Sequence, residues 1–506
     1  MNAEPKASAP LKIAIAGGGT AGWMAANLMA HRWRDRPIEI TVIESPDIGI
    51  IGVGEGSTPQ LKAFFTGLGI DEADWMPACN ATYKNGISFY GWSDRENCAG
   101  YFHPFPAPID THTAPAFYFH SHFRRLGFDL EAHPDRFFLS AALARKKLAP
   151  IPNQNFPFEM AYGYHFDAYL VGAFLRDHAK AQGVVHLEAK ITHVDVDETG
   201  AISALRLDDD RRFDADFFVD ATGFRSLLLQ GAMDVKFMSF AKNLFADSAV
   251  VMPTPSDPDG LASQTTATAL KNGWVWNIPL TNRTGNGYVY SSSYCSEDEA
   301  EAELRAHLGL EDSDVEVRQL KMKVGQVEKH WSKNCLAVGL SQGFIEPLEA
   351  TALHLVQATV EQFIAAFEQG GFTAQNEDAF NRDISARFEG VRDYIVCHYR
   401  ANLRIDTDYW RDNAANDHLS ESLQRIFECW FSQGDLKQEI ANQDIAKYYS
   451  LTSWICLLGG YGNYPSPQSL KPPQADLQRF DLAVIDDFVE RCALNFRDHR
   501  AVLDAA

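Results

Sequence analysis

Three glycines near the N-terminus, Gly17, Gly19 and Gly22, form a G-x-G-x-x-G motif. At this spacing the first glycine permits a tight turn, the second lets backbone approach a pyrophosphate, and the third lets a helix pack against a strand. Glu44 follows Gly22 by 22 residues, where an acid would bind ribose hydroxyls. These four residues predict a dinucleotide site; the alternative is a glycine-rich turn without a ligand.

The elements needed to position this motif flank it on both sides. Residues 11–16 form a short apolar run, the segment from Thr20 to about residue 30 is alanine-rich with a helical pattern, and residues 38–43 are β-branched. Strand, turn, helix and strand make a βαβ unit whose helix N-terminus would face the phosphates. Thr20 and Ala21, at the predicted helix start, are further candidates for cofactor contact.

Later segments extend the predicted cofactor domain far along the chain. Residues 184–219 alternate like a β-meander with a hairpin turn at Thr199-Gly200, and they end at Asp220. A strand at 336–338 ends at Gly339. We expect Asp220 and Gly339 to lie beside the cofactor, because small residues after a strand permit close passage of the chain. A discontinuous domain of this kind favours FAD over a nicotinamide dinucleotide.

The predicted fold class is α/β, a Rossmann-like FAD-binding fold of the flavin monooxygenase type with a mostly helical C-terminal substrate subdomain. The other segments have these predicted forms: a loop at 50–60, an irregular insertion at 95–160, two strands in 264–293, a helix at 351–369 and mainly helix after 377. The predicted domains are a flexible N-terminus (1–10), a discontinuous FAD-binding core with inserted β-meander and substrate-site segments (11–375), and a mainly helical substrate-covering subdomain (376–506).

Composition excludes several classes of protein. The chain has 506 residues, of which 46% are hydrophobic, so it can bury a large core. A net charge of -22 without a cluster of Lys or Arg argues against nucleic-acid binding. The eight cysteines share no C-x-x-C spacing, which is typical of a reducing compartment. With no signal-peptide pattern and no apolar run of about 18 residues, we expect a cytoplasmic protein without a membrane span.

Several motifs occur together in one order along the chain. They are G-G-G-T-A-G-W at 17–23, G-V-G-E-G-S-T-P at 52–59, D-A-T-G-F-R at 220–225, W-V-W-N-I-P at 274–279, G-Y-V-Y-S at 287–291 and P-L-E-A-T at 347–351. With these motifs the chain resembles the flavin-dependent tryptophan halogenases from about residue 11 to 360, and more weakly beyond. The W-x-W-x-I-P segment after G-x-G-x-x-G is the most specific part of the resemblance.

The resemblance implies a reaction sequence. Reduced FAD reacts with O2 to give a flavin hydroperoxide, a halide (bromide or chloride) attacks it, and the resulting hypohalous acid passes through a tunnel to a lysine beside the substrate. The family lysine falls on Lys84. An ammonium can polarise hypohalous acid, and a desolvated amine can carry the halogen as a haloamine. Without the resemblance, Lys84 would be taken for a surface lysine.

The family's active-site carboxylate falls on Glu349, three residues after Glu346. A base at this position could remove the ring proton or orient the hypohalous acid. The alternative for Glu349 is an acid that stabilises the N-terminus of the following helix. The family's halide site uses backbone N–H groups near Thr351 and Ala352. Alanine at 350 and 352, where the family commonly has serine and glycine, would crowd that anion site.

Aromatic residues complete the predicted site. Trp274 and Trp276 are two apart, so on a strand they face one way and could separate flavin from substrate. His103 and Phe105 match the family's ring-stacking residues, and Trp454 is a further stacking candidate. Trp454 lies in residues 448–455, which contain no glutamate and no cation. This predicts a shortened lid and a preference for an indole-like ring over free tryptophan, whose charges need partners.

The chain contains no second G-x-G-x-x-G, which predicts that a separate NAD(P)H-dependent flavin reductase supplies reduced FAD. A homodimer is possible, and bromide is slightly favoured over chloride because it is more easily oxidised. Two other functions stay open: a flavin monooxygenase that hydroxylates an aromatic ring, and an FAD-binding protein without catalysis. Lys84 and the paired tryptophans favour the halogenase.

Overall fold

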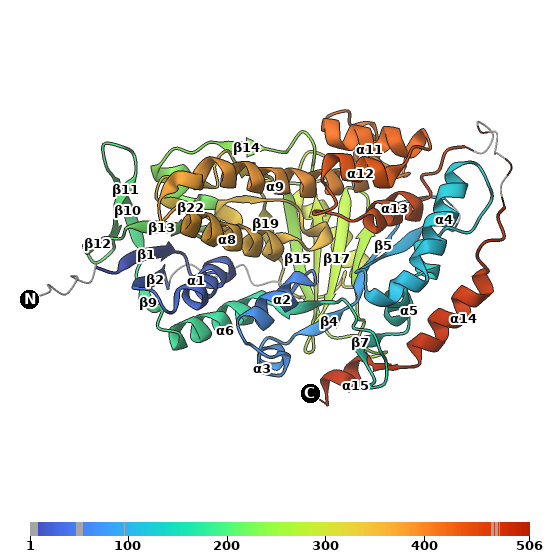
Figure 1. Cartoon of the computed structure of the whole chain (residues 1–506), viewed down its shortest axis with the longest axis horizontal. Helices are drawn as coiled ribbons and strands as arrows, with labels where there is room; N and C mark the ends of the chain where they lie inside the picture. Colours follow the sequence, from blue (N-terminus) through green and yellow to red (C-terminus); the bar gives the residue numbers. More distant parts are fainter. Residues whose placement is uncertain are drawn as a thin grey trace, which may run out of the picture.

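The computed structural model describes residues 9–46, 54–95, 97–466, 470, 474 and 476–505. Most of the segment predicted as a flexible N-terminus lies outside these residues, as do the first two residues of the motif at 52–59. Figure 1 shows an elongated molecule with the N-terminal βαβ unit at one end and the C-terminal helices at the other.

A six-stranded sheet carries the predicted dinucleotide motif. Its order is β21 (Trp331–Ser332), β22 (Cys335–Ala337), β13 (Phe217–Asp220), β1 (Leu11–Ala16), β2 (Ile38–Glu44) and β9 (Val185–Glu188). All neighbours pair in parallel except β21 and β22. Helices α1 (Thr20–Trp33), α6 (Ala168–Ala181) and α8 (Ala352–Gln369) pack together beside it. The predicted βαβ unit and α/β fold class are confirmed.

The predicted β-meander is confirmed only in its middle. Strands β10 (Ile191–Val196) and β11 (Ile202–Leu207) pair as a hairpin around Thr199-Gly200, and β12 (Arg212–Phe213) follows. The first and last strands of the segment, β9 and β13, instead join the six-stranded sheet. Their parallel partners come from distant parts of the chain, which local alternation cannot reveal.

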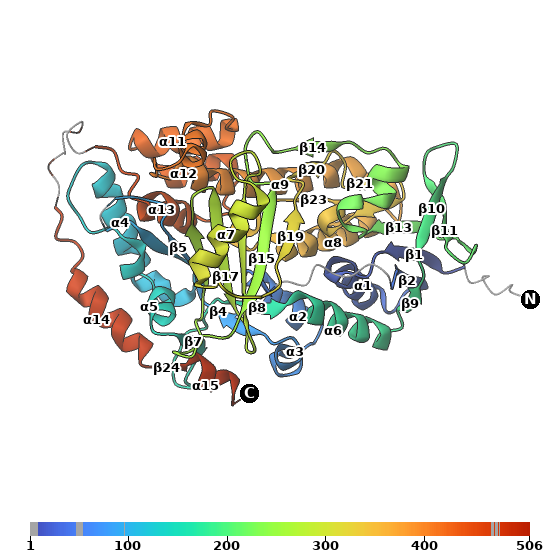
Figure 2. The ribbon, with the colours of Figure 1, turned by 180° about the vertical axis from the view of Figure 1, so that it is seen from behind.

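A second, seven-stranded sheet forms the centre of the molecule. Its order is β19 (Arg318–Lys321), β15 (Ser248–Thr254), β18 (Thr284–Tyr290), β17 (Gly273–Pro279), β16 (Thr265–Ala269), β5 (Gly86–Tyr90) and β6 (Gly100–Pro104). Helix α7 (Glu297–Leu308) packs against β15 and β18 (Figure 2). Residues 264–293 therefore hold three strands and not two. The extra strand, β16, alternates threonine with alanine and lacks the large apolar side chains that mark a strand.

The predictions for 95–160 and 50–60 were wrong in part. The first segment is not irregular, because it contains β6, α4 (Ala114–Arg125), α5 (Leu139–Arg145) and β7 (Leu148–Pro152). Its core is built from aromatic rings such as Phe117, whose ring centre lies 5.3 Å from that of Phe138. A helix is usually recognised by aliphatic residues at helical spacing, so this segment was not recognised as helical. The second segment includes β3 (Gly54–Gly56), which pairs with β8 (Gly163–Asp167); β4 (Thr82–Lys84) pairs with the same strand.

The C-terminal region is mainly helical, as predicted. Its helices are α9 (Glu377–Arg400), α10 (Asp408–Ala415), α11 (Glu421–Phe431), α12 (Leu436–Gln443), α13 (Leu451–Gly460), α14 (Leu482–Ala493) and α15 (His499–Leu503). Helix α9 packs along α8, and the helical prediction for 351–369 is confirmed by α8 itself. Helix α13 packs against β6 and α4, so it covers the end of the seven-stranded sheet (Figure 1).

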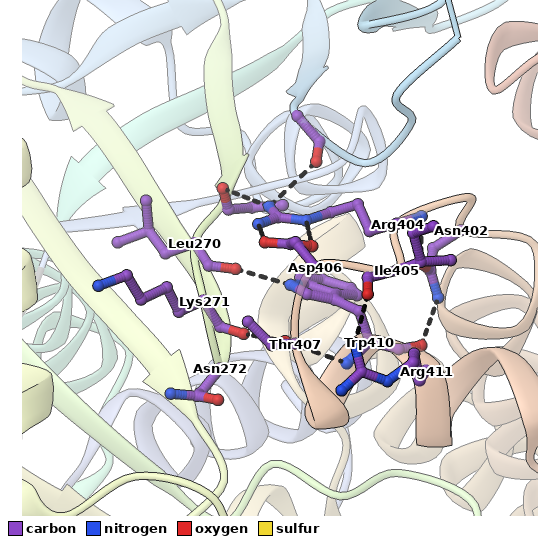
Figure 3. A network of polar contacts seen from close by, with 12 residues as sticks. Leu270, Lys271, Asn272, Asn402, Arg404, Ile405, Asp406, Thr407, Trp410 and Arg411 are labelled. Carbon is purple, nitrogen blue, oxygen red and sulfur yellow. Dashed lines mark hydrogen bonds and ion pairs between the residues drawn. The ribbon is translucent and has the colours of Figure 1, made fainter.

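The segment between α9 and α10 fixes these helices to the turn that joins β16 to β17. Arg404 Nη1 donates to the carbonyl of Ala269 at 3.0 Å, and Trp410 Nε1 donates to the carbonyl of Leu270 at 2.7 Å (Figure 3). These bonds hold the chain after α9 and the start of α10 against the turn that precedes β17, the strand that carries Trp274 and Trp276.

In the part of the chain that the structure describes, no helix is both long and apolar enough to cross a bilayer. Within the same residues no group of three or more His, Cys, Asp or Glu side chains is arranged to hold a metal ion. All eight cysteines are free thiols.

Candidate active site

The glycine motif forms a turn in which two of the glycines are required by close contact. Gly17 has a φ of +107°, and a Cβ there would lie 2.3 Å from the carbonyl oxygen of Ala221. A Cβ on Gly22 would lie 2.1 Å from the carbonyl oxygen of Gly17. Gly19 caps the N-terminus of α1, and a Cβ there would meet nothing within 4 Å. The open side of the turn therefore faces the helix N-terminus, which suits a phosphate.

Glu44 lies at this turn, as predicted. A Cβ on Gly18 would come within 2.2 Å of its carboxyl carbon, so the acid packs directly over the turn. His186 Nε2 donates a hydrogen bond to Glu44 Oε2 at 2.9 Å. No sequence motif pointed to His186, which comes from β9 and meets Glu44 through the parallel pairing of β2 with β9.

Asp220 has a structural role that its sequence position did not indicate. Its carboxylate is fully buried and accepts hydrogen bonds from six donors of its own chain: the backbone N–H and hydroxyl of Thr222, the hydroxyls of Ser226 and Ser341, and the backbone N–H groups of Leu228 and Leu229. A carboxylate has about four lone-pair sites, so these donors occupy it fully within the protein. Asp220 therefore orders the turn that follows β13, while its place beside the cofactor stays a prediction.

Gly339 brings a later segment against the same turn. It has a φ of +64°, and a Cβ there would lie 2.7 Å from the Cβ of Ala21. The turn after β22 can therefore approach the start of α1 only because residue 339 lacks a side chain. Thr20, beside Ala21, donates its hydroxyl to the carbonyl of Ala168 at 3.2 Å, which ties α1 to α6.

Lys84 is buried at the end of β4, so the surface alternative is wrong. Its side chain is 0% exposed, and no group among the described residues forms a hydrogen bond with its Nζ. The Nζ lies 5.5 Å from the centre of the Phe105 ring. Burial lowers the pKa of Lys84 from 10.5 to about 7, against the opposing charge of Glu349. At neutral pH the amine can therefore both donate a hydrogen bond and act as a nucleophile.

Glu349 is held by two histidines. His103 Nδ1 lies 2.9 Å from one carboxylate oxygen, and His398 Nε2 lies 2.9 Å from the other. Burial alone would raise the pKa of Glu349, but the charge and hydrogen bond of His103, with the hydrogen bond of His398, hold it at about 2. The carboxylate is thus ionised at every working pH. It precedes α8 in the chain, and its side chain is directed to the two histidines.

Glu346 is buried like Glu349 but differs from it in its hydrogen-bond partners and in its pKa. Its Oε2 accepts hydrogen bonds from Trp274 Nε1, at 3.1 Å, and from the hydroxyl of Tyr399. Burial raises its pKa to about 7, although both hydrogen bonds act in the opposite direction. This carboxyl group therefore lies against Trp274, and below its pKa of about 7 it is mostly uncharged.

The two tryptophans of β17 lie on one face, as predicted. The ring centres of Trp274 and Trp276 are 6.1 Å apart. The Trp276 ring occupies the space beside Gly287, where a Cβ would lie 2.0 Å from the indole. A residue larger than glycine at position 287 would displace the Trp276 ring. The glycine in the neighbouring strand β18 therefore makes the space that this ring occupies.

Two of the three predicted substrate residues, His103 and Trp454, contact Tyr394 of α9. The His103 ring lies 5.9 Å from the Tyr394 ring, and Trp454 of α13 lies 5.0 Å from it at a steep angle. The Tyr449 ring stacks on the Tyr394 ring, with 3.6 Å between the ring centres. The third predicted substrate residue, Phe105, instead has its ring beside the Nζ of Lys84. All of these side chains are buried, so the described part of the predicted lid is packed against the site.

The predicted halide residues lie at the start of α8. Thr351 is the N-cap of the helix, and Ala352 is its first residue. Ala350 has a φ of +55°, a conformation in which a Cβ is strained. The helix N-terminus offers backbone donors suited to an anion.

Three side chains of α9 were not foreseen: Tyr394, His398 and Tyr399. The sequence carried one usable signal, because Tyr394 and His398 are four residues apart and therefore share a face of the helix. That face meets Glu349, since His398 contacts both the carboxylate and the hydroxyl of Tyr461 at 2.8 Å.

Comparisons with known proteins agree with this geometry. The family model described as tryptophan halogenase matches residues 12–475. The chain is 36% identical over 480 residues to the 7-chloro-L-tryptophan 6-halogenase KtzR of Kutzneria sp. strain 744, covering 90% of this chain and 92% of that protein.

Solved structures give the same result. The tryptophan 6-halogenase SttH of Streptomyces toxytricini superposes with a TM-score of 0.85 at 31% identity, covering 98% of this chain and 100% of that one. BrvH, a flavin-dependent halogenase from Brevundimonas sp. BAL3, gives a TM-score of 0.83 at 33% identity, with 98% of each chain covered.

Proposed function

Because this chain belongs to the tryptophan halogenase family, and is thus a flavin-dependent halogenase, we propose that it halogenates a small electron-rich aromatic ring of the indole type. We further propose that the reaction takes place between Lys84 and Glu349. The observation that carries the proposal is the burial of these two groups, at the positions of the family lysine and carboxylate, within one aromatic cluster.

The residues at the N-terminal turn fit a flavin dinucleotide. The open side of Gly19 at the N-terminus of α1 would receive the phosphates, and Glu44 lies where the ribose hydroxyls would need an acceptor. Bound FAD, reduced by a separate flavin reductase, would supply hypohalous acid from O2 and a halide. We place the halide at the backbone of Thr351 and Ala352, at the start of α8.

Lys84 and Glu349 then have complementary tasks. Lys84 donates a hydrogen bond to the oxygen of the hypohalous acid and polarises its oxygen–halogen bond. A ring carbon supplies the electron pair for the new carbon–halogen bond, the oxygen–halogen bond breaks, and the hydroxide leaves as water with a proton from the Lys84 ammonium. Glu349 accepts the proton that the ring carbon loses. Water is the only other product.

Trp274 and Trp276 serve to keep the two half-reactions apart. Their rings lie side by side on β17, and Trp274 is fixed through its indole N–H to Glu346. A substrate that reached the flavin directly could be hydroxylated, so a fixed aromatic wall favours halogenation.

The side chains around the reaction centre suit a neutral ring. Tyr394, Trp454 and Phe105 are aromatic and uncharged, and the charge of Glu349 is already paired with His103. A free amino acid would need partners for an ammonium and a carboxylate, and burying either without one is costly. We therefore propose indole as a better substrate than L-tryptophan. Bromide is proposed as the better halide, because it is more easily oxidised than chloride.

The proposal is tested by steady-state kinetics on indole and L-tryptophan with the same flavin reductase, and with bromide and chloride in separate and mixed reactions. Products are identified by mass spectrometry. We expect a higher kcat/KM for indole and mainly brominated product from the mixture. A higher kcat/KM for L-tryptophan would refute the substrate assignment, and a ring that gained oxygen in place of halogen would favour the hydroxylase.

A further inference from the structure

A chain of hydrogen bonds behind Lys84 has only one possible direction. The hydroxyl of Thr82 donates its single hydrogen to the carbonyl of Pro279 at 2.7 Å. His165 Nδ1 lies 3.0 Å from the same hydroxyl oxygen, so it must be the donor in that contact. His165 is fully buried, which lowers its pKa well below 6.5, with the charge of Lys84 adding to the effect. The ring is thus neutral, with its hydrogen on Nδ1.

The other ring nitrogen fixes the role of Thr265. Because Nε2 of a neutral His165 protonated on Nδ1 carries no hydrogen, it can only accept. Its partner is the hydroxyl of Thr265 at 2.9 Å, which must therefore donate. The oxygen of Thr265 has no hydrogen left and can offer only lone pairs to anything else nearby.

The free side of Thr265 meets Lys84 across a small opening over Gly56. A Cβ on Gly56 would lie 3.3 Å from Lys84 Nζ, 3.3 Å from Thr265 Oγ1 and 3.7 Å from the Cβ of Ala350. Gly56 does not have a positive φ, so its backbone does not require glycine. The position is tight for a carbon atom, but an oxygen atom there would lie 3.3 Å from both a donor and an acceptor, within hydrogen-bonding range.

We propose that this opening holds the hypohalous acid, and that Thr265 is the residue that orients it. The O–H of the acid donates to Thr265 Oγ1, while its oxygen accepts from Lys84 Nζ. With both contacts made, the halogen is the one atom of the acid left to point away from them, past Ala350 and toward the substrate. The inference rests on the proposed function, because it concerns the intermediate that reaches Lys84.

The contacts of the acid with Lys84 and Thr265 account for both hydrogens of the water that leaves. When the oxygen–halogen bond breaks, the oxygen keeps the hydrogen that faces Thr265 and takes a second one from the Lys84 ammonium, so water leaves. Thr265 and His165 are unchanged at the end. Thr265 therefore acts by holding the acid and gives up no proton.

The test uses Thr265→Val and Thr265→Ser in the full-length enzyme, with a flavin reductase, bromide and indole. Thr266→Val is the matched control, because its side chain leaves the strand on the opposite face. Two quantities are measured: bromoindole by mass spectrometry, and free hypobromite by bromination of a cyclic β-diketone trap. We expect the ratio of bromoindole to free hypobromite to fall about tenfold in Thr265→Val, the effect of one lost hydrogen bond, with the sum of both products unchanged.

Thr265→Ser should keep the wild-type ratio, since it keeps the hydroxyl. An unchanged ratio in Thr265→Val, or a serine variant that behaves like the valine variant, would overturn the proposal. A wild-type enzyme that makes neither bromoindole nor hypobromite would instead refute the proposed function. If Thr265→Val fails to fold, nitrogen-15 NMR of labelled histidine in the wild-type enzyme decides: a hydrogen on Nε2 of His165 would contradict the assigned direction.

Discussion

Replacing Lys84 with methionine should stabilise the protein while it removes the reacting amine. Methionine keeps the length of the side chain and packs well against a ring such as Phe105. The lysine pKa of 10.5 is lowered by burial to about 7, so at pH 7 the folded state carries a cost of about 4 kcal/mol that the unfolded chain does not. Lys84→Met removes this cost, and the melting temperature should rise by several degrees.

The stabilisation gained by Lys84→Met should decrease as the pH rises. Between pH 7 and 10.5 the unfolded chain binds more protons at residue 84 than the folded one, so wild-type stability rises with pH. The advantage of Lys84→Met should therefore shrink to about 2 kcal/mol at pH 9 and vanish near pH 10.5. Thermal melting of both proteins from pH 6.5 to 10 measures it, with the exposed Lys437→Met as control. An equal or lower melting temperature for Lys84→Met at pH 7 would show that the buried lysine does not destabilise the folded state.

Further predictions concern the two glutamates, the supply of reduced flavin and Gly56. Glu349→Gln should lower turnover at least about a hundredfold, because it removes the ring base. Glu346→Gln should cost much less, because burial keeps this carboxyl largely protonated below its pKa of about 7 and an amide resembles it; equal losses in steady-state assays would contradict this. Halogenation should require externally reduced FAD, so rapid product formation with NADH alone would reveal a nicotinamide site. Gly56→Ala should lower the ratio of brominated to chlorinated indole in equal halide, because its Cβ narrows the opening beside Lys84; an unchanged product ratio would contradict it.

The residues that could be found from sequence are those whose task is set by their own segment. Gly17 and Gly22 must be glycine because a side chain at either position would collide with nearby backbone. A requirement of this kind is visible as a local sequence motif. Lys84, Glu349 and the two tryptophans were located by resemblance, and the structure adds their burial and partners. Composition alone would have placed Lys84 on the surface.

The residues that sequence could not reveal are those that meet only through the tertiary fold. His398 reaches Glu349 because α9 packs along α8, and His165 reaches Thr265 because β4 and β8 pair behind the seven-stranded sheet. The structural role of Asp220 was hidden for the same reason, because one of the six donors that bind its carboxylate comes from the distant Ser341 and the others from the turn that follows β13.

If Lys84 receives the oxidised halogen, as proposed, the halogen is used at this residue and is not released into solution. The most direct measurement supplies Lys84→Met with reduced flavin, O2, bromide and indole, and compares bromoindole with trapped hypobromite against the wild-type enzyme. We predict that the variant still binds FAD and still forms hypobromite, which escapes to the trap, while bromoindole falls to the level made by free hypobromite. Bromoindole formed by the variant at the wild-type rate would contradict the claim.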